Sequence, residues 1–167
     1  MSRVVAIAGG SGGLGRALVN ALKKSTYTPL ILARKVTLFR IANAPLEEEL
    51  GVPVLQANYS DLDSLVQLLG SHNIDTVVST ISNYDNSHFA EASLIKAAEQ
   101  SIVTHRYIPS VWSAFDYGEN QENALAASRL ALINALRGTP LEWTALYTGT
   151  FLDFYAITVP SKDSAGP

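Results

Sequence analysis

The residues whose types and spacing point most directly to a chemical function form a glycine-rich stretch near the N-terminus, Gly9-Gly10-Ser11-Gly12-Gly13-Leu14-Gly15. The stretch follows an apolar run and precedes residues with helical spacing, as a turn between a strand and a helix does. Its glycines allow a sharp turn, a close approach of the backbone to a pyrophosphate, and tight packing of helix on strand. The first N–H groups of the helix then face phosphate oxygens. The stretch therefore predicts a dinucleotide site, and a glycine turn without a ligand is the alternative.

Two cations, Arg34 and Lys35, stand at the end of the second apolar run. An NAD site usually has Asp or Glu there, which accepts hydrogen bonds from the ribose hydroxyls. A guanidinium instead binds a 2′-phosphate in a bidentate manner, whereas a carboxylate repels it. The pair predicts NADP(H) as the cofactor, and the alternative is a solvated strand end that carries two ordinary cations.

The same glycine stretch also matches the G-x-S-x-G pattern of a hydrolase nucleophile, with Asp75 and either His88 or His105 completing a Ser, Asp, His order. The match lies on the first strand, however, and we expect no upstream loop to donate the second N–H of an oxyanion hole. The additional glycines suit a close approach of phosphate better. We therefore favour dinucleotide binding over an esterase.

Composition excludes several classes of protein. The 167 residues are 47% hydrophobic and 16% charged, which is incompatible with intrinsic disorder. The absence of cysteine excludes disulfides, a cysteine zinc site and thiol catalysis. The three histidines are not spaced as metal ligands, so we expect no metal. No apolar run is long enough to cross a bilayer, so we expect no membrane partner and a cytoplasmic location.

The charges are distributed unevenly along the chain. The first 46 residues contain seven Lys or Arg and no Asp or Glu, and the remainder carries a formal charge of -10. The cations are dispersed among expected strand and helix positions rather than gathered in the block that is typical of a polyanion-binding tail. The pattern favours a phosphorylated small ligand over nucleic acid.

Apolar runs alternate with helical patterns, which is typical of a doubly wound α/β domain with a parallel sheet. Helices are expected over 14–22, 62–69, 89–100 and 124–136, and a capping box is expected with Ser60 as the N-cap residue. A weak boundary lies at 35–45, and residues 159–167 are expected to form a frayed tail after a domain over 1–158. Strands are expected at Val4–Ala8, Pro29–Ala33, Val52–Gln56, Thr76–Ile81, Val103–Ile108 and Trp143–Tyr147.

Several motifs resemble the NmrA-like, isoflavone-reductase-like group of atypical short-chain dehydrogenases. The resemblance implies an NADP-binding Rossmann fold with strand order 3-2-1-4-5-6. It also implies a cofactor site that includes Asn58, Tyr59, Ser79, Thr80, Ile81, Pro109 and Ser110. The matching stretches are the turn at 9–15, Leu32-Ala33-Arg34, Gly51–Val54, Asn58–Asp61, Asp75–Ile81, Arg106–Ser110, Leu141–Thr144 and Thr148–Phe151.

Two departures from that group bear on catalysis. Its enzymes have a proton-transferring lysine at the apparent position of Arg129, and arginine is a poor proton donor. Its members also continue past the sixth strand into a substrate-binding portion that this chain is expected largely to lack. Without that portion, the substrate cleft beside the cofactor is expected to be open in a monomer. We therefore expect either a homo-oligomer that covers the cleft with Phe151, Phe154 and Tyr155, or very low turnover.

We interpret the chain as an NADPH-dependent oxidoreductase acting on a small organic substrate. Trp112, Phe115 and Tyr117 suit an aromatic substrate, although core packing is the simpler explanation of these rings. The alternative function is a non-catalytic NADP(H) sensor that acts on a regulatory protein partner.

Overall fold

The computed structural model describes residues 3–34, 44–82, 88–112, 124–149 and 151. Within these ranges the chain forms one parallel six-stranded sheet with the order β3-β2-β1-β4-β5-β6, as expected from the sequence. The strands are β1 (Val4–Ala8), β2 (Thr28–Arg34), β3 (Val54–Ala57), β4 (Ile74–Ser79), β5 (Arg106–Ile108) and β6 (Glu142–Trp143).

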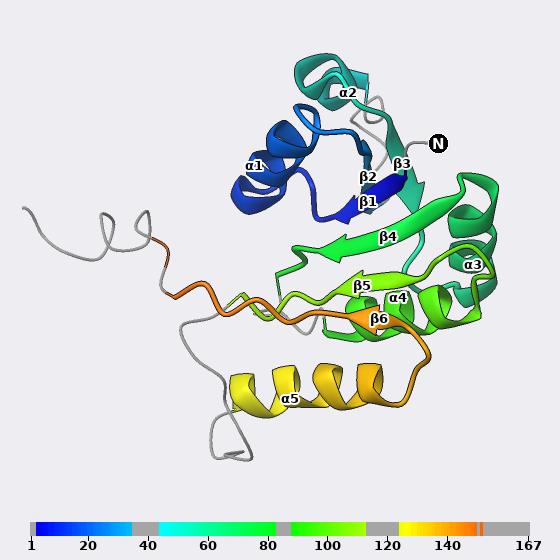
Figure 1. Cartoon of the computed structure of the whole chain (residues 1–167), viewed down its shortest axis with the longest axis vertical. Coiled ribbons are helices and arrows are strands. Elements are labelled where there is room, and N and C mark those ends of the chain that lie inside the picture. The colour runs from blue at the N-terminus through cyan, green and yellow to red at the C-terminus, as the bar shows by residue number, and fades with distance from the viewer. Residues whose placement is uncertain (1–2, 35–43, 83–87, 113–123, 150, 152–167) are drawn as a thin grey trace, which may run out of the picture.

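Helices connect successive strands in the described chain. Figure 1 shows α1 and α2 in the upper part of the view, with α3, α4 and α5 below them. The strand order reverses between β1 and β4, which is the switch point at which such sheets bind ligands. The helices are α1 (Gly13–Leu22), α2 (Ala44–Leu50), α3 (Leu62–Ser71), α4 (His88–Gln100) and α5 (Ala124–Arg137).

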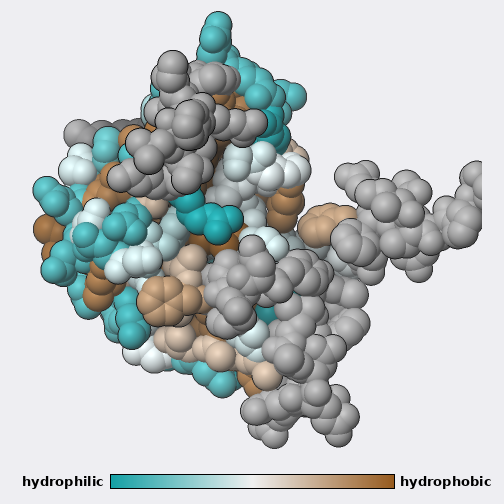
Figure 2. Space-filling model, turned by 180° about the vertical axis from the view of Figure 1, so that it is seen from behind, coloured by the Kyte–Doolittle hydropathy of each residue, from teal (hydrophilic) through white to brown (hydrophobic). Residues whose placement is uncertain are grey.

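Each face of the sheet has its own hydrophobic core. Val19 of α1 and Leu50 of α2 pack with Ile7 and Ile31 on one face. The helices α3, α4 and α5 contribute the larger cluster on the other face, through residues such as Leu65, Leu94 and Leu136. Side chains that alternate along a strand enter opposite cores, so burial on both faces explains why β1 and the middle of β2 are continuously apolar. Seen from behind, the described surface intersperses hydrophilic and hydrophobic groups (Figure 2).

Several expected details were wrong. The N-cap of α3 is Asp61 and not Ser60, because the Asp61 Oδ1 accepts a hydrogen bond of 3.0 Å from the Ser64 N–H. The fifth strand starts at Arg106 rather than Val103, since the Val103 N–H bonds to the Ser101 hydroxyl and the Thr104 hydroxyl donates to the Ile74 carbonyl of the neighbouring strand.

The sixth strand ends early and one helix was missed. Expected to Tyr147, the strand stops at Trp143, because its neighbour β5 is only three residues long and pairs with β6 through Arg106 and Tyr107 alone. Helix α2, at Ala44–Leu50, begins near the end of the expected boundary at 35–45 and was not predicted. It presents only Leu46 and Leu50 at helical spacing, which is too short a pattern to recognise.

Candidate functional site

Three glycines of the turn, Gly9, Gly10 and Gly15, have no room for a side chain. Gly9 has a φ of +82°, and an added Cβ there would lie 2.9 Å from the Thr80 backbone. An added Cβ at Gly10 would lie 2.7 Å from the Ile31 side chain, and one at Gly15 would lie 2.5 Å from the Gly10 Cα. These glycines are therefore required by the packing of the turn between β1 and α1.

Gly12 and Gly13 have no such internal requirement. An added Cβ at Gly12 would meet only the Gly9 carbonyl oxygen, at 3.5 Å, and one at Gly13 would meet nothing within 4 Å. Gly12 is the N-cap of α1 with an extended backbone that any residue adopts, and no side chain caps the helix. The free space and the uncapped helix N-terminus fit a phosphate group, which the backbone N–H groups can bind.

A cavity of about 350 Å³ lies at the carboxyl ends of the strands, next to this turn. It brings together residues from the ends of β1, β2 and β4, the segment after β3, and the start of α4. The lining consists of Gly9, Ser11, Gly12, Leu32, Ala33, Arg34, Tyr59, Thr80, Ile81, Ser82 and Ala90.

Arg34 and Tyr59 are the lining residues with titratable side chains. Arg34 is exposed at the end of β2, while Tyr59 is only 7% exposed and its hydroxyl donates to the Leu32 carbonyl at 3.4 Å. Burial raises the pKa of Tyr59, the Arg34 guanidinium partly opposes this increase, and the negative charge of Glu91 adds to it. Tyr59 is therefore a neutral phenol at physiological pH, within electrostatic reach of a cation and an anion.

The cavity includes seven of the residues predicted for the site, and the other predicted residues that the structure describes lie outside its lining. Lys35 is outside the described residues. The lining residues Leu32, Ala33, Ser82 and Ala90 were missed, and their position at strand ends was the signal that could have found them. The predicted residues that do not line the cavity are Gly10, Gly13, Leu14, Gly15, Asn58, Ser79, Pro109 and Ser110.

Three of those residues make hydrogen bonds that hold segments next to the cavity lining in place. The Ser79 carbonyl accepts a hydrogen bond of 2.8 Å from the Trp112 indole N–H, and Ser79 itself is fully buried. The Ser110 hydroxyl donates to the carbonyl of Ile81 at 2.8 Å. The Asn58 Oδ1 accepts from the Ser60 N–H at 3.2 Å, within the turn that leads out of β3. These contacts hold the segments from which the lining side chains project.

Two of the N-terminal cations have partners inside the chain. The Arg16 guanidinium donates to the Ser11 carbonyl at 2.9 Å and pairs with Glu49 of α2. The Lys23 ammonium donates to the Leu50 carbonyl at 2.6 Å, at the end of α2. Part of the early positive charge thus ties α1 to α2, and Arg34 is the described cation that faces the cavity.

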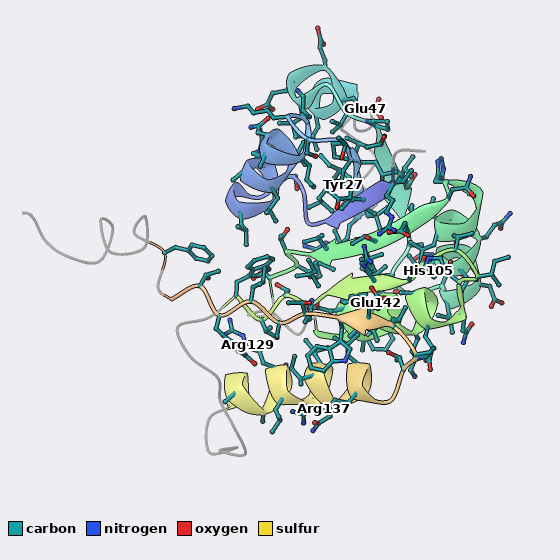
Figure 3. All side chains as sticks on the ribbon, in the orientation of Figure 1. Tyr27, Glu47, His105, Arg129, Arg137 and Glu142 are labelled. Carbon is teal, nitrogen blue, oxygen red and sulfur yellow. The ribbon has the colours of Figure 1, made fainter. Side chains whose placement is uncertain are left out.

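The proposed catalytic candidates do not gather at the cavity. Arg129 lies on α5, on the side of the carboxyl ends but outside the lining (Figure 3). Asp75 and His105 pair at 3.3 Å near the amino ends of β4 and β5, so neither can act on Ser11 at the opposite end. The side chain of His88, like Phe115, Tyr117, Phe154 and Tyr155, lies outside the described residues. The described residues contain no cluster of potential metal ligands.

A doubly wound sheet with a glycine turn and a cavity at its switch point defines a dinucleotide-binding α/β domain. The model of the NAD(P)H-binding family matches residues 9–163, and the chain belongs to this family. The cofactor class expected from the glycine turn is thereby confirmed as NAD(P)H. None of the described helices is long and apolar enough to span a membrane.

The chain is similar to known oxidoreductases. Oxidoreductase BOA1 of Botryotinia fuckeliana is 33% identical over 97% of this chain and 53% of its own length. Isoflavone reductase homolog P3 of Arabidopsis thaliana is 24% identical over 93% of this chain and 51% of its own. These names confirm the resemblance expected from the motifs, and the chain spans about half the length of the curated relatives it matches.

Solved structures agree on the fold. The structure of AtPrR2 with NADP+ and (+)pinoresinol superposes with a TM-score of 0.78 at 22% identity, over 93% of this chain and 52% of that one. A crystal structure of isoflavone reductase gives a TM-score of 0.77 at 19% identity, over 100% of this chain and 56% of that one. At this level of identity the likeness establishes the fold and no more.

Proposed function

We propose that the chain is the NADP(H)-binding part of an oxidoreductase that reduces a small organic substrate. The observation that carries the proposal is the presence of Arg34 and the open face of Gly12 on one cavity. The Gly9–Gly12 backbone would bind the pyrophosphate, and Arg34 would bind the 2′-phosphate that distinguishes NADP from NAD. The names of the relatives, reductases and oxidoreductases, support this class of reaction.

The far end of the cavity suits the reacting part of the cofactor. Ile81 and Ala90 form an apolar wall there, away from Arg34, and Ser82 adds a polar group. NADPH supplies the hydride when it is bound, so the residues of this chain need only bind, orient and partly dry the site. The small-molecule substrate would approach from this end.

Isothermal titration calorimetry with NADPH and NADH tests the assignment of Arg34. Replacing the guanidinium in Arg34→Gln should weaken NADPH binding by about tenfold or more, because a charge-assisted contact is lost. NADH binding should be unchanged, as should both affinities in the control Arg137→Gln, an exposed cation on α5. An equal loss for NADPH and NADH would contradict the 2′-phosphate assignment.

A turnover assay distinguishes the proposed oxidoreductase from the alternative, a non-catalytic NADP(H) sensor. The wild-type chain should consume NADPH in the presence of carbonyl or enone substrates, followed by the loss of NADPH absorbance. Tight NADPH binding without consumption across the substrate panel would favour the regulatory alternative, in which occupancy alters a protein contact.

A further inference from the structure

A side chain outside the cavity lining binds the backbone of the glycine turn. Arg16 lies near the start of α1, and its Nε donates a hydrogen bond of 2.9 Å to the Ser11 carbonyl. Its backbone N–H donates to the Gly12 carbonyl, also at 2.9 Å. Ser11 and Gly12 both line the cavity, and Arg16 does not. Arg16 therefore contacts, from outside the cavity, two residues of the turn at which the pyrophosphate is proposed to bind.

These hydrogen bonds affect which polar groups of the turn can meet a ligand. The Gly9 carbonyl accepts from the Gly12 N–H at 3.0 Å, and the Ser11 and Gly12 carbonyls accept from Arg16. A carbonyl oxygen carries a partial negative charge and repels a phosphate unless a donor compensates it. The first N–H groups of a helix, in contrast, have no acceptor within the helix. The turn thus combines compensated carbonyls with N–H groups that can bind an anion.

The guanidinium of Arg16 is itself held by a second helix. One of its terminal nitrogens pairs with the carboxylate of Glu49 on α2, and the two helices lie next to each other (Figure 1). A guanidinium is a planar fork of donors, so its Nε binds the turn while a terminal nitrogen binds the carboxylate in a fixed relative orientation. The Ser11 carbonyl is thereby connected to α2 through one rigid group.

Net charge does not account for this arrangement. Glu49 compensates the positive charge of Arg16, and the two side chains are 36% (Arg16) and 55% (Glu49) exposed. Water and salt screen such a pair, so it attracts a distant anion weakly and adds little to the stability of the fold. The contacts instead fix the position of the Ser11 carbonyl.

We propose that Arg16 is a positioning residue that preorganises the glycine turn for the pyrophosphate of the dinucleotide, with Glu49 as its anchor on α2. The inference rests on the proposed function, in which the pyrophosphate binds at Gly9–Gly12. A turn that is already held in its binding conformation loses less conformational freedom when the ligand arrives, so the affinity is higher. Both NADPH and NADH contain the pyrophosphate, so Arg16 should strengthen the binding of both, unlike Arg34.

Calorimetry with NADPH and NADH on the full chain tests the proposal. Arg16→Met keeps most of the aliphatic stem and removes every side-chain donor, so it should weaken both cofactors by the same factor, about tenfold. Arg16→Lys keeps the charge without the fork and should recover only a small part of the affinity. The midpoint of urea denaturation should stay at the wild-type value in both variants, because the pair is exposed.

Glu49→Ala distinguishes positioning from simple attraction by the sign of its effect. The variant leaves Arg16 in place but removes both its anchor and the compensating negative charge. An Arg16 that acted through its charge alone would then bind either dinucleotide more tightly. Loss of the anchor should instead weaken both cofactors, by about threefold.

Two exposed neighbours provide matched controls. Lys24→Met removes a positive charge just beyond the end of α1, and Glu48→Ala removes a negative charge from the same helix as Glu49. Both variants should bind NADPH and NADH with wild-type affinity, because exposed charges away from the turn are screened.

Several outcomes would overturn the inference. Wild-type affinity in Arg16→Met or Arg16→Lys would exclude a positioning role, and a lowered urea midpoint together with weaker binding would reduce Arg16 to a structural residue. Selective weakening of NADPH in Arg16→Met would assign Arg16 to the 2′-phosphate. Unchanged or tighter binding by Glu49→Ala would contradict the proposal even if Arg16→Met does not fold. Failure of the wild-type chain to bind either cofactor would instead refute the proposed function.

Discussion

The two ends of the parallel sheet use polar side chains in opposite ways. Near the amino ends, polar side chains form pairs across neighbouring strands that are at least partly exposed: His105 lies 3.3 Å from Asp75, and Arg106 lies 2.6 Å from Glu142. Figure 3 shows His105 and Glu142 on this side, opposite to Arg129. At the carboxyl ends, Ser79 and Glu91 are fully buried around the cavity.

The difference shows where this sheet can support chemistry. Water and salt screen the exposed pairs at the amino ends, so they add little to stability and create no lasting field. The buried groups at the carboxyl ends are weakly screened, and each fixes backbone that borders the cavity. Variants of these buried groups should therefore alter both stability and binding, whereas variants of the pairs at the amino ends should alter neither.

Gly15→Ala should give the largest effect. The new Cβ would lie 2.5 Å from both the Gly10 Cα and the Gly9 carbonyl oxygen, so the backbone of the turn must shift. We expect a loss of about 3 kcal/mol or more in the free energy of unfolding, measured by urea denaturation. Gly13→Ala is the control, because its Cβ meets nothing within 4 Å, and it should retain wild-type stability.

Gly12→Val should separate binding from stability. The valine would occupy open space above the turn, so the free energy of unfolding should change by less than about 1 kcal/mol. The same space is the proposed position of the pyrophosphate, so the affinity for NADPH should fall by about tenfold or more. Circular dichroism and calorimetry measure the two effects, with Gly70→Ala on α3 as the control. Unchanged NADPH affinity would show that the pyrophosphate does not bind at the turn.

Alkaline pH should destabilise the buried side of the sheet. Burial raises the pKa of Tyr59 and Tyr107, so the folded chain retains two phenolic protons that the unfolded chain releases near pH 10. The stabilisation from these protons is complete below pH 10 and declines as the pH rises further. Urea denaturation at pH 9 and pH 11 should show this decline, and Tyr59→Phe should reduce it. An identical decline in that variant would contradict the assignment.

The exposed pair Arg106–Glu142 should give the smallest effect. Both side chains are well exposed, at 40% and 69%, so their attraction is screened and offset by lost side-chain freedom. Arg106→Gln and Glu142→Gln should each leave the Tm without a measurable change. A clear drop would show that the amino ends matter as much as the carboxyl ends do.

Local sequence patterns predicted the sheet and the turn well. The apolar runs gave the strands, and the glycine spacing gave the turn between β1 and α1, because both depend on neighbouring residues alone. Asp61 rather than Ser60 caps α3, since two adjacent residues can both act as caps and only the backbone geometry selects one.

The sequence contains no local pattern that predicts the burial of Glu91. A glutamate in a helix normally faces solvent, and its burial here depends on Ser110, which is 19 residues away in the sequence. Arg16 is a similar case, because its partner Glu49 lies on a helix that the periodicity did not reveal. Contacts between distant residues decide which charges are buried, and no local pattern contains that information.

The hydrogen bond from Trp112 to Ser79 holds a fluorescent side chain beside the cavity. The chain has two tryptophans, and Trp143 lies on the edge strand β6. The Trp112 indole is half-buried and is held 2.8 Å from the carbonyl of the residue before the lining residue Thr80. In a chain with Trp143→Phe, fluorescence would therefore come from one indole beside the cavity, and stopped-flow recordings could time the arrival and departure of a nucleotide.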